Sequence, residues 1–175
     1  MAEVEIHAAH GHGADPFAQR VGILVGVIGI LLSVVTILSH REHTAAVVHK
    51  TEANDQWAYY QAKKIREHDQ EVAGELLTAL AADPAKVAAA SAKFAQEAAR
   101  YARDADAIQR EAEARDAQAE RSERRALLFD FGEGFLELGL VMASLFFLSQ
   151  RRFFVAFGAS AALIGTVIGI LGLLR

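Results

Sequence analysis

Residues 83–126 read DPAKVAAASAKFAQEAARYARDADAIQREAEARDAQAERSERRA, a long alanine-rich run with charged residues throughout. One set of residues recurs in it at alternating steps of four and three, which is the a/d spacing of a coiled coil. Glycine is absent and the single proline lies at the start, so the spacing predicts one long helix with a packing seam. The seam consists of Val87, Ser91, Phe94, Ala98, Tyr101, Ala105, Ile108, Ala112, Arg115, Ala119, Ser122 and Ala126.

Residues 40–82 precede this stretch, favour a helix throughout and supply the predicted partner. Asp83 and Pro84 suit the N-cap and first turn of the second helix, so we expect the chain to fold back near residues 81–84. Both helices would be about 60–70 Å long at about 1.5 Å per residue, which returns the chain to its starting level. The predicted contact stripe, interrupted by Asp69, is Ala58, Ala62, Ile65, Val72, Leu76 and Leu80.

Three apolar segments enclose the charged stretch. Residues 21–38 and 153–174 carry no charge, and residues 126–149 carry only three carboxylates before the closing turn. Each segment is long enough to cross a hydrocarbon core, which takes about 20 helical residues. We therefore predict membrane spans at 16–39, 126–149 and 153–174, after a flexible histidine-containing tail at 1–15.

The predicted fold is an all-α membrane protein with three transmembrane helices. A long antiparallel coiled-coil hairpin, residues 40–129, is inserted between the first and second of them. Two alternatives stay open: a soluble three-helix protein, and a disordered charged loop in place of the hairpin. The count of Lys and Arg beside the spans favours a cytoplasmic arm, although the short basic loop at residues 150–152 argues for the opposite orientation.

The composition argues against several functional classes. The chain has no cysteine, which excludes disulfides, thiolate nucleophiles and cysteine-based metal sites. Its net charge of -4 argues against nucleic-acid binding, for which a basic stripe is expected. The histidines lack a carboxylate at suitable spacing, and no phosphate loop, zinc-protease or nucleophile-elbow motif is present. We expect no catalytic activity, no cofactor and no bound metal.

Glu133 and Glu137 are the sharpest chemical signal in the sequence. Being four residues apart, they share one helix face inside the second predicted span. A carboxylate at that depth is costly unless it is protonated, paired or facing water. Three interpretations stay open: an ion or proton site, a hydrogen-bonded contact between helices of an oligomer, or an interfacial position if the span begins later.

Glycines recur at helical spacing in the first and third predicted spans. Gly22 with Gly26, and Gly165 with Gly169, match the G-x-x-x-G pattern of closely packed membrane helices. The pattern predicts close packing in either of two forms, within one chain or between subunits.

Residues 54–64 read NDQWAYYQAKK and hold the only Trp of the chain. Aromatic side chains with polar tips suit a contact surface that is only partly dry. We predict an oligomer or partner interface there; the alternative is a wide layer inside the hairpin, with Trp57 near Ile108 and Asp55 paired to Arg110. The predicted interface residues are Asp55, Gln56, Trp57, Tyr59, Tyr60, Gln61 and Lys63.

The same run resembles the signature of a bacterial membrane-protein family, domain of unknown function 4337 (DUF4337). Residues 130–138, DFGEGFLEL, with Leu140-Val141 and Ser144-Leu145 after them, also resemble the second span of that family. The resemblance covers nearly the whole chain and implies a multi-pass protein of the bacterial inner membrane. Since the family carries no known activity, the resemblance implies no catalytic residue.

Together these features predict a non-enzymatic, homo-oligomeric scaffold or interaction protein of the inner membrane, assembled through the helical arm and the glycine-striped spans. Its expected partners are the lipid bilayer, further copies of itself, and another membrane or cytoplasmic protein. The alternative function is an ion or proton channel or transporter that uses Glu133 and Glu137.

Overall fold

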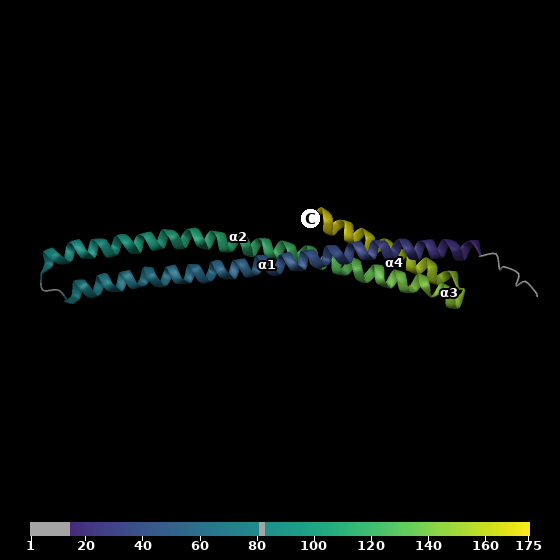
Figure 1. Cartoon of the computed structure of the whole chain (residues 1–175), viewed down its shortest axis with the longest axis horizontal. Helices are drawn as coiled ribbons and strands as arrows, with labels where there is room; N and C mark the ends of the chain where they lie inside the picture. Colours follow the sequence, from purple (N-terminus) through teal and green to yellow (C-terminus); the bar gives the residue numbers. More distant parts are fainter. Residues whose placement is uncertain (1–14, 81–82) are drawn as a thin grey trace, which may run out of the picture. The chain divides into compact units, whose positions relative to one another are not determined.

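The computed structural model describes residues 15–80 and 83–175, and these are helical apart from short caps and turns. The helices are α1 (Pro16–Leu80), α2 (Pro84–Ser144), α3 (Phe146–Ser149) and α4 (Arg152–Leu174) (Figure 1). The all-helical prediction is confirmed, and three helices are long and apolar enough to cross a membrane. Residues 1–14 of the predicted tail and residues 81–82 of the predicted turn lie outside the described ranges.

Local signals explain where the helices begin and end. The Asp15 carboxylate accepts a hydrogen bond of 3.0 Å from the Phe17 amide, and Pro16 occupies the first helical position, where its missing N–H costs nothing. α2 ends at Ser144, earlier than the predicted end of the second span, and the one-turn helix α3 continues to Ser149. Gln150 then adopts a left-handed conformation with φ 54°, which reverses the chain before α4.

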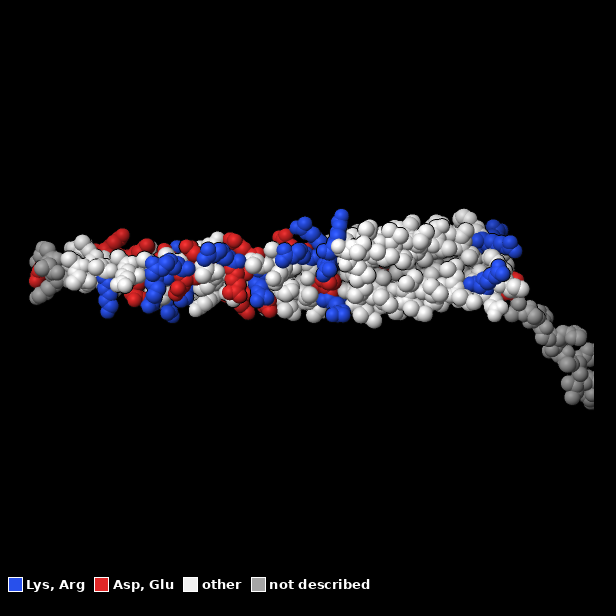
Figure 2. Space-filling model, turned by 90° about the horizontal axis from the view of Figure 1, so that it is seen from above, with Lys and Arg blue, Asp and Glu red and all other residues white. Residues whose placement is uncertain are grey.

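The chain divides into two compact units. The charged unit is Arg41–Arg124, formed by the C-terminal part of α1 and the N-terminal part of α2. The apolar unit contains the described residues up to His40 together with Arg125–Arg175. Acidic and basic side chains gather over the charged unit, whereas most of the visible surface of the apolar unit carries none (Figure 2).

The apolar unit packs three helices around a small core. Large apolar side chains also cover its outside; Ile30 and Leu163, for example, are 68% and 66% exposed. Soluble monomers rarely expose apolar patches larger than a few hundred Å², so this surface suits a hydrocarbon solvent better than water. The core residues are Ile28 and Val35 of α1, Phe129, Leu136 and Ala143 of α2, and Ala162 of α4.

In the charged unit, α1 and α2 pack in opposite directions. Lys50 contacts Asp116, Lys63 contacts Asp104, and Gly74 lies against Phe94. All twelve residues of the predicted α2 seam are buried or half-buried. Its alanines, with Ala105 and Ala112 fully buried, let the two helices approach closely.

The predicted contact stripe of α1 is wrong. All six of its residues are exposed, Ile65 to 62%. Because the α2 seam is rich in alanine, long α1 side chains lay their aliphatic parts over it and extend their polar ends to the rim. The inward face of α1, half-buried or buried at the same alternating spacing, is Glu42, Ala46, His49, Ala53, Gln56, Tyr60, Lys63, Glu67, Gln70, Gly74 and Leu77.

Candidate functional site

Asp116 of α2 joins two side chains of α1. Its Oδ1 accepts a hydrogen bond of 2.7 Å from Lys50 Nζ, and its Oδ2 accepts one of 2.8 Å from Trp57 Nε1. The Trp57 ring also meets Tyr60 edge to face, with centroids 5.7 Å apart. Helical side chains lean toward the N-terminus of their own helix, so the indole N–H reaches past the level of Ile108, the expected neighbour, to Asp116.

A second contact lies farther along the seam, twelve residues from Asp116 in α2. Lys63 Nζ donates to Asp104 Oδ2 at 3.0 Å and lies 5.4 Å from the ring centroids of both Tyr59 and Tyr101. In the layer next to Asp116, Arg115 Nη1 donates to Glu52 Oε2 at 2.9 Å. Polar and cation–π contacts between α1 and α2 of one chain therefore occupy this part of the predicted interface.

The predicted interface set divides between two faces of α1. Gln56, Trp57, Tyr60 and Lys63 are half-buried toward α2, whereas Asp55, Tyr59 and Gln61 are exposed. The alternative pairing of Asp55 with Arg110 inside one chain is wrong. Both side chains are exposed, and neither forms an ion pair within the described part of the chain.

Hydrogen bonding sets the charge state of the Asp116 contact. The hydrogen bond from Lys50, and then that from Trp57, lowers the pKa of the Asp116 carboxyl, while the bond to Asp116 raises the pKa of Lys50. A lowered carboxyl pKa stabilises the fold above the unfolded value of about 3.9, and this stabilisation is lost as pH falls through the folded pKa. The raised pKa of Lys50 stabilises the folded state at pH values below about 10.4, the pKa of an unfolded lysine. This stabilisation is lost as pH rises through the folded pKa of Lys50.

We expect acid to release Trp57 from Asp116. In the full-length protein in detergent, the emission of the single Trp should shift as pH falls below about 4, because the protonated carboxyl loses its Lys50 partner. Asp116→Asn should lack this transition, and Asp106→Asn, which removes an exposed carboxylate, should keep it. An unchanged transition in Asp116→Asn would contradict the assignment.

Glu133 and Glu137 face different surroundings in the apolar unit. Glu133 is half-buried and its Oε1 accepts a hydrogen bond of 2.7 Å from the Thr36 hydroxyl of α1. Glu137 is exposed, and within the described residues it has no hydrogen bond or ion pair. The two carboxylates therefore share a helix without forming one site in this chain.

Sequence reasoning missed Thr36 and the neighbouring Ser39. The Ser39 hydroxyl is buried and donates to Asp130 Oδ1, one turn from the Thr36–Glu133 contact. The available signal was two hydroxyls three residues apart at the end of the first apolar run, opposite carboxylates three residues apart. These contacts hold α1 against α2; no group of three or more metal-binding side chains occurs in the described ranges.

The predicted packing glycines also divide into two groups. A Cβ on Gly165 would lie 2.6 Å from the Gly132 carbonyl oxygen, and Gly169 lies against Val35. α4 therefore touches the α2 backbone directly, an approach that only a residue without a side chain permits. An added Cβ on Gly22 or Gly26 would meet no described atom beyond the backbone of its own helix within 4 Å, and both glycines are exposed, so they face outward.

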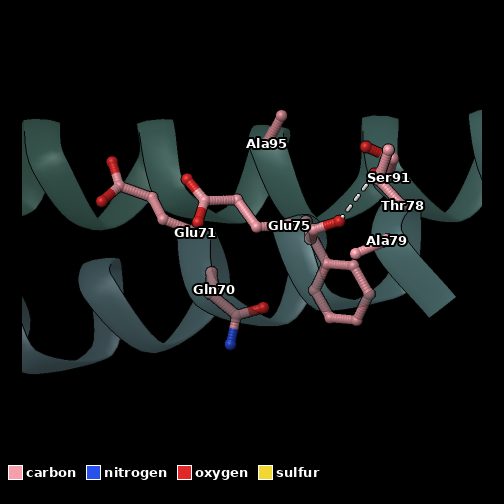
Figure 3. A pocket seen from close by; sticks show the side chains of 9 residues that line it. Gln70, Glu71, Glu75, Thr78, Ala79, Ser91 and Ala95 are labelled. Carbon is pink, nitrogen blue, oxygen red and sulfur yellow. Dashed lines mark hydrogen bonds between the residues drawn. The ribbon is translucent and has the colours of Figure 1, made fainter.

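An open groove of about 660 Å³ lies beside Gly74 and Phe94 in the charged unit (Figure 3). The Glu71 and Glu75 side chains extend in the same direction along it, and the Thr78 hydroxyl donates to the Gly74 carbonyl at 2.8 Å. No cation or imidazole is among its lining residues.

The family model described as a domain of unknown function (DUF4337) matches residues 17–175. This confirms the resemblance carried by residues 54–64 and 130–138. No curated protein matches the chain, and no solved structure matches it.

Proposed function

The chain belongs to the DUF4337 family, whose description assigns no activity, and we propose that it is a non-enzymatic, homo-oligomeric scaffold of the bacterial inner membrane. In this proposal the apolar parts of α1 and α2, the latter with α3, and α4 cross the bilayer. Length, composition and the exposed apolar side chains support this. The charged unit forms an antiparallel coiled-coil arm in water.

The outward face of α1 in the charged unit is the observation that carries the proposal. Its residues recur at alternating steps of three and four, and all are exposed. α1 therefore has a heptad seam toward α2 and a second, largely apolar seam toward solvent, as expected of a helix with a neighbour on each side. This outer stripe of α1 is Val48, Thr51, Asp55, Ala58, Ala62, Ile65, Asp69, Val72, Leu76 and Ala79.

Glu137 supports assembly in the apolar unit. An ionisable side chain inside a membrane span normally faces the bundle interior or a water-filled cavity, yet Glu137 faces away from its own chain. A neighbouring copy would cover it, and outward-facing Gly22 and Gly26 would let spans of two copies approach closely. The assembled arms would then offer their polar flanks to another membrane or cytoplasmic protein.

The second candidate is an ion or proton channel, because Glu137 alone would line a path between copies. Wild type and a Glu133→Gln, Glu137→Gln variant, each in liposomes with an entrapped pH dye, separate the two functions. We expect neither to exceed the proton flux of protein-free liposomes, and both to give the same particle mass in detergent. Flux in the wild type that the double substitution abolishes would overturn the scaffold in favour of the channel.

The single variants separate structural from conducting roles. Glu133→Gln should lower the thermal midpoint, because it replaces the carboxyl group that accepts the hydrogen bond from Thr36, whereas Glu137→Gln removes no contact within the described residues. Circular dichroism at rising temperature measures both midpoints.

A further inference from the structure

The outward face of α2 in the charged unit is a basic stripe. Ten residues at alternating steps of three and four are all exposed, and six of them are Lys or Arg while none is acidic. They lie on the opposite side of α2 from the seam that meets α1. This outer stripe of α2 is Lys93, Gln96, Arg100, Arg103, Ala107, Arg110, Ala114, Ala117, Arg121 and Arg124.

The outer stripe of α1 has the complementary character. It carries two carboxylates, Asp55 and Asp69, and no Lys or Arg. Neither carboxylate has an ion pair within the described residues, and neither have Arg103 and Arg110 on the α2 stripe. Each chain therefore presents an apolar, acidic stripe on one side and a basic, alanine-containing stripe on the other.

The charged residues of the two stripes also lie at matching levels along the helix axes. Lys50 meets Asp116, Lys63 meets Asp104 and Gly74 meets Phe94, so levels on α1 convert directly to levels on α2. Interpolation at the helical rise places Asp55 at the level of about residue 111, and Asp69 at about residue 99. Arg110 and Arg100 lie within about one turn of these levels.

We propose that the charged units of neighbouring copies pack side by side, with the outer stripe of α1 in one copy against the outer stripe of α2 in the next. Asp55 then pairs with Arg110 across the contact, and Asp69 with Arg100, which in the single chain bonds Glu97 at 2.7 Å. Ile65, Val72 and Leu76 cover the aliphatic stems of the arginines. This inference rests on the proposed homo-oligomer and names its surface.

Charge selects this contact over a symmetric one. Copies inserted in one membrane in the same orientation stand at equal heights, so a contact between two α1 stripes would bring Asp55 opposite Asp55. A contact between two α2 stripes would oppose six cations to six, and like charges reject such pairings. The α1–α2 contact is head to tail, and it repeats around a ring or along a row.

The absence of native cysteine permits a direct test. In full-length protein purified in mild detergent and oxidised, the Asp55→Cys, Arg110→Cys double variant should form a ladder of disulfide-linked multimers. The two positions face away from each other in one chain, so a disulfide inside the chain is excluded by its narrow Cα distance range. Each single variant should remain one chain on a denaturing gel.

Gln61→Cys with Asp106→Cys is the matched control, because both positions are exposed at corresponding levels and lie on the flanks of the stripes rather than along them. We expect its cross-linked fraction to be lower by roughly tenfold, given the strict geometry of disulfides. Disulfide-linked dimers of the Asp55→Cys single variant would contradict the head-to-tail contact. They would indicate a symmetric contact between two α1 stripes instead.

The outcomes also separate this inference from the proposed function. If the particle has a multimeric mass but gives no ladder of cross-linked chains, the stripe contact is refuted and the oligomer is not. A single-chain mass would refute both. If no ladder forms while the protein binds vesicles of anionic phospholipid and Arg110→Cys binds them less, the α2 stripe is a lipid contact instead.

Discussion

Gly165→Ala is expected to destabilise the apolar unit by about 1–3 kcal/mol, the usual cost of overpacking a tight contact. The added Cβ would lie 2.6 Å from the Gly132 carbonyl oxygen and 2.9 Å from the Leu136 amide nitrogen. Both are backbone atoms that cannot rotate away, so α2 and α4 must separate. The measurement is the thermal midpoint of the helical circular dichroism signal in one fixed detergent.

Gly74→Ala is the control for this prediction. The same substitution there meets only Phe94 Cβ at 3.5 Å, an ordinary van der Waals distance. Because Ala favours a helix over Gly by about 1 kcal/mol, the Gly74 variant should melt at or above the wild-type midpoint. Equal losses in the two variants would contradict the direct backbone contact of α2 with α4.

The second large effect is expected from Ile65→Lys combined with Leu76→Lys, which should reduce the assembly to single chains. These side chains are 62% and 54% exposed and help to form the outer stripe of α1. Lysine there places new cations opposite the basic stripe of α2 and removes apolar contact area. A loss of about 3 kcal/mol in the free energy of association raises the dissociation constant on the order of 100-fold. Light scattering of the detergent-solubilised protein measures the result.

Glutamate at the same two positions is the matched control. It removes the same apolar groups but adds charge of the sign that the α2 stripe attracts, so we expect it to retain association better than lysine does. Both variants should keep the helical signal of the wild type, because Lys and Glu favour a helix at least as well as Ile and Leu do at exposed positions. Identical dissociation by lysine and glutamate would argue against a basic partner surface.

Twelve residues of α2 repeat one spacing in the sequence, and all twelve are buried or half-buried in the structure. The partner face of α1 was misassigned for a physical reason. Apolar content marked Ile65 and Leu76 as inward, but the alanines of α2 accept polar side chains such as Gln56 and Lys63 instead. Periodicity reveals that a seam exists and does not reveal which neighbour it meets.

The candidate site was predictable to a similar degree. The G-x-x-x-G pattern marked Gly165 and Gly26 alike, although only Gly165 contacts another helix of its own chain. The pairing of Trp57 with Asp116 escaped sequence reasoning because it depends on the lean of a long side chain toward its helix N-terminus. Glu133 and Glu137 were recognised together, yet only the register of α1 against α2 gives Glu133 its Thr36 partner.

The mass of the wild-type protein in mild detergent, corrected for bound detergent by multi-angle light scattering, tests self-assembly most directly. We expect a mass that is a whole-number multiple, two or more, of the 18.9 kDa chain. A mass of one chain at every concentration measured would contradict it, and would leave the outer stripes of α1 and α2 without their proposed partner.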